Sequence, residues 1–118
     1  MKVLVADDSV MMRKIILRSL SSLGLTNCVE AKDGQEAINL FQSETFDLFL
    51  TDWNMPKKSG LELVTEIRAT GANLPIIMIT TEAQKIQVAQ AMDAGVTDYL
   101  TKPFDNDGLR AKLSKYVA

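Results

Sequence analysis

The chain has 118 residues, of which 47% are hydrophobic and 24% charged, a balance typical of one globular domain with a hydrophobic core. Its 13 basic and 15 acidic residues give a net charge of −2, which excludes the basic surface expected of a nucleic-acid-binding domain. A single cysteine, Cys28, excludes an internal disulfide, and no apolar run is long enough to span a bilayer. We expect a cytoplasmic domain over residues 1–118, with no output domain.

Five short apolar segments predict β-strands, at residues 3–6, 28–31, 48–51, 76–80 and 99–100. They are rich in Val, Ile and Leu and alternate little with polar residues, which is typical of strands covered on both faces.

Helical periodicity separates these segments, and predicts helices at residues 9–23, 35–43, 60–69, 82–94 and 107–117. Gly24 and Gly95 end the first and fourth of them, and Asp105 or Asn106 caps the last. Five alternations of strand and helix predict an α/β fold with a parallel sheet between two layers of helices, because parallel neighbours need right-handed crossovers.

Polar residues follow four of the predicted strands. Asp7 and Asp8 follow the first and Asp52 follows the third, while Thr80 ends the fourth and Lys102 follows the fifth. In open α/β sheets the ligand crevice lies at the carboxyl ends of the strands. If the three aspartates share a site, the first and third strands are neighbours and the strand order is 2-1-3-4-5.

Three carboxylates so close together would repel one another, by roughly 4 kcal/mol per pair at 4 Å and an effective dielectric of 20. A bound cation relieves this repulsion, and hard oxygen ligands with room for water suit Mg²⁺. Lys102 adds a second cation, and the Thr80 hydroxyl can donate to a phosphoryl oxygen. These groups predict phosphoryl transfer with Asp52 as the nucleophile, which forms an aspartyl phosphate.

With these residues in this order, the chain resembles the receiver domains of bacterial two-component response regulators. The match covers the whole chain and rests on Asp7-Asp8, Asp52, Thr80 and Lys102-Pro103 in register, while Trp53-Asn54 points to the stand-alone chemotaxis regulators. The resemblance implies a flavodoxin-like fold, a single five-stranded parallel sheet with five flanking helices, for which the order 2-1-3-4-5 is already known.

The resemblance also implies roles for individual residues. Asp8 and Asp52 would bind Mg²⁺ directly, together with the backbone carbonyl of Asn54, and Asp7 would bind it largely through a water molecule. Asn54 and Glu82 stand at the two positions that tune the lifetime of the acyl phosphate. Both are polar and can orient a hydrolytic water, so we expect fast self-dephosphorylation.

Thr80 and Tyr99 match the switch pair of the family, in which the threonine moves to the phosphoryl group and the tyrosine turns inward. The output face would comprise the fourth helix, fifth strand and fifth helix, around Val88, Tyr99, Thr101 and Lys112. The Lys102–Pro103 peptide is expected to be cis. Ser59 departs from the family, which often has Asp at that position.

The chain contains no histidine, so the phosphodonor is expected to be a separate CheA-like histidine kinase or a small acyl phosphate. The resemblance implies a monomeric phosphoryl acceptor, not a turnover enzyme. Its target would be the flagellar motor switch, and a phosphatase would be a further partner. It would bind neither nucleic acid nor membrane. Alternatives are a receiver in a phosphorelay or a non-chemotaxis pathway, an unphosphorylated interaction module, and a haloacid-dehalogenase-like phosphatase.

Overall fold

Five strands and five helices alternate along the chain in the computed structural model, which describes residues 1–82 and 84–117. The elements are β1 (Val3–Ala6), α1 (Val10–Ser22), β2 (Cys28–Ala31), α2 (Gly34–Ser43), β3 (Leu48–Thr51), α3 (Gly60–Ala69), β4 (Ile76–Thr80), α4 (Lys85–Ala94), β5 (Asp98–Thr101) and α5 (Asn106–Ser114). Within the described residues, none of the helices has the length and apolar character needed to cross a membrane.

All five strands form one parallel sheet in the order β2-β1-β3-β4-β5, which confirms the predicted order. β1 lies directly beside β3, with Ala6 opposite Thr51. Asp7 and Asp52 are the next residues of these two strands, and the Asp52 amide donates to the Ala6 carbonyl at 3.0 Å. The register therefore brings the two aspartates to the same point of the sheet edge.

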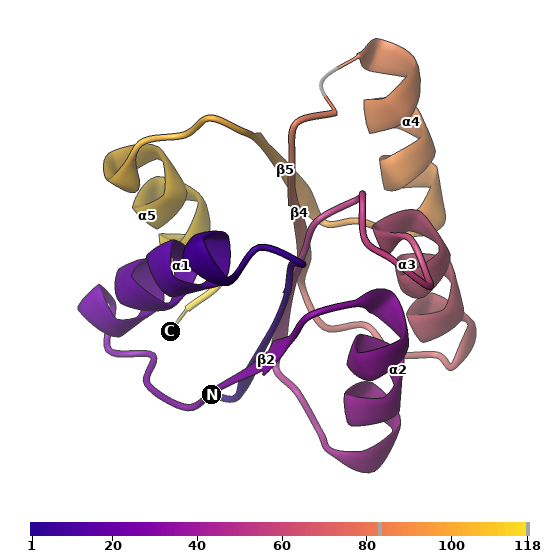
Figure 1. Cartoon of the computed structure of the whole chain (residues 1–118), viewed down its shortest axis with the longest axis horizontal. Helices are drawn as coiled ribbons and strands as arrows, with labels where there is room; N and C mark the ends of the chain where they lie inside the picture. Colours follow the sequence, from indigo (N-terminus) through magenta and orange to yellow (C-terminus); the bar gives the residue numbers. More distant parts are fainter. Residues whose placement is uncertain (83, 118) are drawn as a thin grey trace.

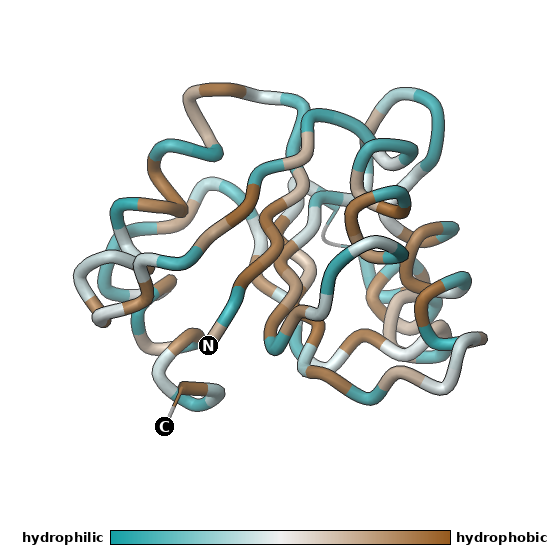
Figure 2. Tube along the Cα trace, turned by 90° about the horizontal axis from the view of Figure 1, so that it is seen from below, coloured by the Kyte–Doolittle hydropathy of each residue, from teal (hydrophilic) through white to brown (hydrophobic). Residues whose placement is uncertain are grey.

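The sheet stands between two layers of helices, with α1 and α5 on one face and α2, α3 and α4 on the other (Figure 1). Alternate residues of each strand enter different cores: Leu4 packs under α2 and α3, whereas Val3 and Val5 pack under α1 and α5. Both sets are fully buried, which explains why the strands show so little alternation. Figure 2 shows hydrophobic residues along the central strands and hydrophilic ones on the outer turns of the helices.

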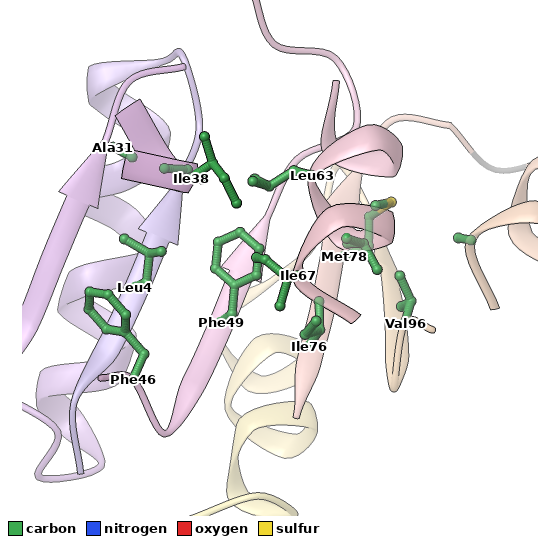
Figure 3. Close-up of a cluster of buried hydrophobic side chains, with 14 residues drawn as sticks. Leu4, Ala31, Ile38, Phe46, Phe49, Leu63, Ile67, Ile76, Met78 and Val96 are labelled. Carbon is green, nitrogen blue, oxygen red and sulfur yellow. The ribbon is translucent and has the colours of Figure 1, made fainter. Parts of the chain in front are cut away.

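Phe49 of β3 occupies the middle of the larger core (Figure 3). Its ring points toward Leu63 and Ile67 on the inner face of α3, and all three side chains are fully buried. This packing presses α3 onto β3 and so anchors the loop between them, which begins at Asp52.

The predicted ends of α1, α2, α5 and β5 were wrong by one to three residues. Ser9 caps α1 instead of starting it, with its hydroxyl accepting from the Met12 amide at 3.2 Å. Asp105 caps α5 in the same way through the Gly108 amide at 2.6 Å, so α5 begins at Asn106 and ends at Ser114, short of the predicted residue 117. β5 is longer than predicted, since its two polar end residues also pair with β4.

α4 begins at Lys85, although the periodicity predicted a start at Glu82. Gln84 is the N-cap but makes no side-chain capping bond, and Ala83 lies outside the described residues. The Glu82 carboxylate instead accepts hydrogen bonds from Asn54 and Gln87, so Glu82 belongs to the loop above the sheet.

Candidate functional site

Lys102 bridges the two aspartates that follow β1 and β3. Its Nζ donates to Oδ2 of Asp7 at 2.8 Å and to Oδ2 of Asp52 at 2.9 Å. The side chains are largely buried, with exposed fractions of 12%, 2% and 10% for Lys102, Asp7 and Asp52. Burial weakens screening by water, so these charges interact more strongly than a surface ion pair would.

The loop between β3 and α3 orients the Asp52 carboxylate. Oδ1 accepts from the Trp53 amide at 2.6 Å and lies 3.4 Å from the Asn54 amide, which leaves Oδ2 directed at Lys102. Gly60 closes the loop, because its amide donates to the Trp53 carbonyl at 2.7 Å. A Cβ on Gly60 would lie only 1.9 Å from the Asp52 carbonyl oxygen, so the close approach requires glycine.

Asp7 and Lys102 perturb each other's protonation. Burial raises the pKa of Asp7, and the hydrogen bonds from Lys102 and from the Ser9 amide only partly oppose it. Burial alone would lower the pKa of Lys102, but the hydrogen bonds to Asp7 and Asp52 outweigh it and raise the pKa. Lys102 is therefore an ammonium ion at neutral pH.

Carboxylate oxygens of Asp7, Asp8 and Asp52 lie within 4.8 Å of one another. Asp8 is exposed while the other two are buried, so the cluster opens to solvent on one side. Lys102 can balance only one of three negative charges, and the donors are hard oxygens, so the cluster fits a divalent cation such as Mg²⁺. The position of the Asn54 carbonyl as a further ligand stays a prediction.

Thr80 and Tyr99 lie on neighbouring strands beside this cluster. Thr80 is fully buried at the end of β4, and its hydroxyl oxygen is 3.4 Å from the Glu82 amide. Tyr99 is half-buried on β5 and its hydroxyl donates to the Glu82 carbonyl. Burial, with Glu82 and Asp52 nearby, raises the pKa of Tyr99, which keeps its hydroxyl protonated.

Glu82 also connects the two loops that border the cluster. Asn54 donates from Nδ2 to Oε1 of Glu82 at 2.8 Å, and Gln87 donates from Nε2 to Oε2 at 2.7 Å. The roles of Asn54 and Glu82 could be predicted from the sequence, but that of Gln87 could not, because nothing in its local pattern marks it. Arg13, which donates to the Asp7 backbone carbonyl, could not be predicted either.

The predicted output residues lie on α4, β5 and α5 as expected from their positions. Val88 is half-buried and Thr101 is exposed. Lys112 is held to β5, because its Nζ donates to Oδ1 of Asp98 at 2.8 Å. The Lys102–Pro103 peptide is cis, as predicted.

A family model described as the response regulator receiver domain matches residues 3–114. The chain belongs to this family. Its predicted fold and resemblance are therefore confirmed. Receiver domains bind Mg²⁺ at an acidic cluster, and Asp7, Asp8 and Asp52 form such a cluster here.

Among receiver domains, similar proteins include chemotaxis regulators. The chain is 43% identical to the chemotaxis protein CheY of Pseudomonas aeruginosa over 117 residues, which are 98% of this chain and 94% of that protein. It is 47% identical to a CheY homologue of Campylobacter jejuni over 116 residues, 96% of this chain and 89% of that one. These relatives make it a receiver of the CheY type.

Solved structures of the same family are also similar to this chain. Chemotaxis protein CheY4 of Vibrio cholerae superposes with a TM-score of 0.89 at 33% identity, covering 98% of each chain. A receiver domain of a Francisella response regulator superposes with a TM-score of 0.90 at 31% identity, covering 98% of this chain and 94% of that one.

Proposed function

We propose that this receiver accepts a phosphoryl group on Asp52 and thereby switches its α4-β5-α5 face to bind a target. The observation that carries the proposal is the position of Lys102, which holds Asp7 and Asp52 at 2.8 and 2.9 Å in a largely buried cluster. An ion pair without a function would cost desolvation energy at this edge of the sheet and would contribute little to stability.

Each residue has a distinct task in the transfer. A carboxylate oxygen of Asp52 attacks phosphorus, and the bond from phosphorus to the donor atom breaks as the donor leaves with its electron pair. Lys102 shifts from the carboxylates to the incoming phosphoryl oxygens, and Thr80 donates its hydroxyl to another. Mg²⁺, held by Asp8 and Asp52 with Asp7 and the Asn54 carbonyl, would neutralise charge on the phosphoryl oxygens when bound.

The signal would pass to the output face through Thr80 and Tyr99. Tyr99 donates to the Glu82 carbonyl in the loop that follows Thr80, so movement of this loop toward a phosphoryl group removes the acceptor of the tyrosine hydroxyl. Tyr99 would then turn inward and reshape the surface around Val88, Thr101 and Lys112.

Reversal is a hydrolysis in which water attacks phosphorus and releases phosphate from Asp52. Asn54 and Glu82 lie on the two loops that border the cluster and would orient this water, so the protein is a phosphoryl acceptor that dephosphorylates itself and not a turnover enzyme. A dedicated phosphatase would accelerate the same step.

The kinase and the target are proposed from the relatives. The donor would be a CheA-type histidine kinase in the cytoplasm, since the chain has no histidine of its own, and the target would be the flagellar motor switch. The support is the CheY name of relatives at 43% and 47% identity. A receiver that serves a phosphorelay would have the same cluster, so the site supports the chemistry and the relatives support the pathway.

Trp53, the only tryptophan, provides the test because its amide bonds to Asp52. Its fluorescence would be followed while Mg²⁺ and then acetyl phosphate are added to the wild type and to Asp52→Asn. Asp93→Asn, which removes an exposed carboxylate on α4, is the matched control. Intact-mass spectrometry would measure the phosphorylated fraction in each sample.

We expect a first change with Mg²⁺ and a second, reversible change with acetyl phosphate in the wild type and in Asp93→Asn. Asp52→Asn should lack the second change and gain no phosphoryl mass. A phosphorylated Asp52→Asn protein would overturn the assignment of the nucleophile. No response of the wild type to Mg²⁺, to acetyl phosphate or to a CheA-type kinase would instead favour the unphosphorylated interaction module.

A further inference from the structure

A cleft of about 140 Å³ lies between α1 and α5. These two helices cover the same face of the sheet (Figure 1). The cleft is lined by Arg18, Ser19 and Ser22 of α1 and by Asn106 and Arg110 of α5. Arg18 and Ser22 are four residues apart, as are Asn106 and Arg110, so each helix turns one polar strip toward the other. Among the residues that the structure describes, no acidic one lines the cleft, although the chain has more acidic than basic residues.

The two arginines of the cleft differ from the other two of the chain. Arg13 pairs with Glu30 at 3.0 Å, and Arg68 donates to the carbonyls of Gly95 and Ala72. By contrast, Arg18 and Arg110 have no hydrogen-bond acceptor or ion-pair partner in residues 1–82 and 84–117. The two guanidinium groups that lack an acceptor therefore line the same small cleft.

Ser19 gives an independent indication of a ligand. The residue is only 4% exposed, yet its hydroxyl has no hydrogen-bond partner within the part of the chain that the structure describes. Its backbone carbonyl is already used, since it accepts from the Ser22 hydroxyl at 2.7 Å. Ser19 lines the cleft, so its hydroxyl is available to a polar group bound there.

The ligand that fits is a small anion. The donors are two guanidinium groups, the Ser19 hydroxyl and the Asn106 amide, and guanidinium groups bind phosphate or carboxylate oxygens in pairs. The cleft is smaller than the roughly 300–1,000 Å³ of sites for drug-sized ligands, so it suits a single oxyanion group and not a nucleotide. In the described residues the Asp105 carboxylate makes no ion pair with either arginine, and its Oδ1 accepts from the Gly108 amide at 2.6 Å.

We propose that the cleft between α1 and α5 is a binding site for a small oxyanion, either phosphate or a carboxylate, held by Arg18 and Arg110 with the Ser19 hydroxyl. The site lies apart from the aspartate cluster, because its residues come from the sides of two helices and not from strand ends. A bound anion would link α1 to the first turns of α5.

The test is an NMR titration of the Mg²⁺-free protein with potassium phosphate and, separately, with potassium acetate. Potassium chloride keeps the ionic strength constant, so that general screening does not change. We expect saturable shifts at Arg18, Ser19, Asn106 and Arg110, and the anion that binds more tightly identifies the ligand as a phosphate or a carboxylate. Shifts confined to Lys102 and its neighbours would place the anion at the aspartate cluster and overturn the proposal.

Arg18→Gln and Arg110→Gln should each weaken binding by about tenfold, since each removes a charged donor. Both side chains belong to exposed residues, so the variants should keep the native spectrum. Lys85→Gln, with the same charge change on the opposite face of the sheet, should bind as the wild type does. Shifts that never saturate, unchanged affinity in both arginine variants, or an equal loss in Lys85→Gln would overturn the proposal.

A thermal measurement supplies a second readout. The anion should raise the melting temperature of the wild type and of Lys85→Gln, because a ligand of the native state stabilises it. The increase should be smaller in both arginine variants. Equal increases in all four proteins would show only a general salt effect and would contradict the site.

Discussion

Asn54 donates a hydrogen bond from Nδ2 to Oε1 of Glu82 at 2.8 Å, which joins the loop after β3 to the loop after β4. The two residues are 28 positions apart in the chain, and both border the Asp52 cluster. Gln87 holds the other oxygen of the same carboxylate at 2.7 Å, so Glu82 is fixed from two sides. We therefore expect Asn54 and Glu82 to affect the half-life of a phosphoryl group on Asp52.

Asn54→Met and Glu82→Lys should each lengthen the phosphoryl half-life. Each variant removes a polar group that would orient the attacking water, and a positioned side chain that assists proton transfer contributes on the order of 10²-fold. We therefore expect a half-life longer by about tenfold or more. The measurement is the decay of phosphorylated protein, followed by intact-mass spectrometry after acetyl phosphate is removed.

Asn27→Met is the control for this measurement, because Asn27 is exposed at the start of β2, away from the cluster. Its half-life should equal that of the wild type. If Asn54→Met and Glu82→Lys also decay at the wild-type rate, the two residues do not tune the lifetime.

Lys102→Arg should still be phosphorylated but should switch poorly. The arginine keeps the positive charge, yet its broad planar guanidinium cannot replace a compact ammonium that lies 2.8 and 2.9 Å from two buried carboxylates. Since a hydrogen bond to a charged group contributes about 1.5–3 kcal/mol, the switched population should fall by about tenfold or more.

The measurement for Lys102→Arg is the NMR shift of Tyr99 at matched levels of phosphorylation. Lys85→Arg, an exposed lysine on α4, should shift as the wild type does. A full Tyr99 shift in Lys102→Arg would show that the ammonium group is not needed for the switch.

Four of the five strands could be predicted to the residue, and three of them, β1, β3 and β4, are apolar runs buried on both faces. The exception was β5, whose end residues Asp98 and Thr101 are polar. They nevertheless pair with Ile77 and Thr80, a contact that no local pattern encodes. The strand order was predicted from the expectation that Asp7 and Asp52 share a site, and β1 does lie beside β3.

Side-chain contacts between distant loops could not be predicted in this way. Glu82 has a strong helical propensity and stands where a helix could begin, but its contacts with Asn54 and Gln87 keep it in the loop. The same holds for Arg18 and Arg110, which are ordinary surface residues in the sequence and meet only because α1 packs against α5. Tertiary packing decides these positions, and the local sequence does not encode it.

Ser59→Ala should destabilise the protein, whereas Ser59→Asp should be nearly neutral. The Ser59 hydroxyl accepts from the Glu62 amide at 3.2 Å and the Glu62 carboxylate accepts from the Ser59 amide at 3.2 Å, which together form a capping box at the start of α3. Losing such a cap costs about 1 kcal/mol, and Asp caps as well as Ser does. The departure from the family at this position therefore preserves the cap.

Urea unfolding monitored by circular dichroism would measure both Ser59 variants. Ser43→Ala, which removes an exposed hydroxyl at the end of α2, is the control and should change the free energy of unfolding less than Ser59→Ala does. If Ser59→Asp were as unstable as Ser59→Ala, the cap would not be the reason that α3 begins at this residue.

Asp98 should contribute stability that disappears in acid. Burial would raise its pKa, but hydrogen bonds from Lys112, from the Tyr99 amide and from the Tyr116 hydroxyl outweigh it and lower the pKa below its ordinary value. The unfolded chain therefore binds a proton more readily than the native one, so this stabilisation is complete above the ordinary pKa of about 4 and is lost as the pH falls through the lower native value.

Asp98→Asn should be less stable than the wild type at neutral pH, and the difference in melting temperature should shrink below about pH 4. Asp93→Asn controls for the loss of one carboxylate on the surface, and a difference between Asp98→Asn and the wild type that stays constant down to low pH would contradict the role of this ion pair.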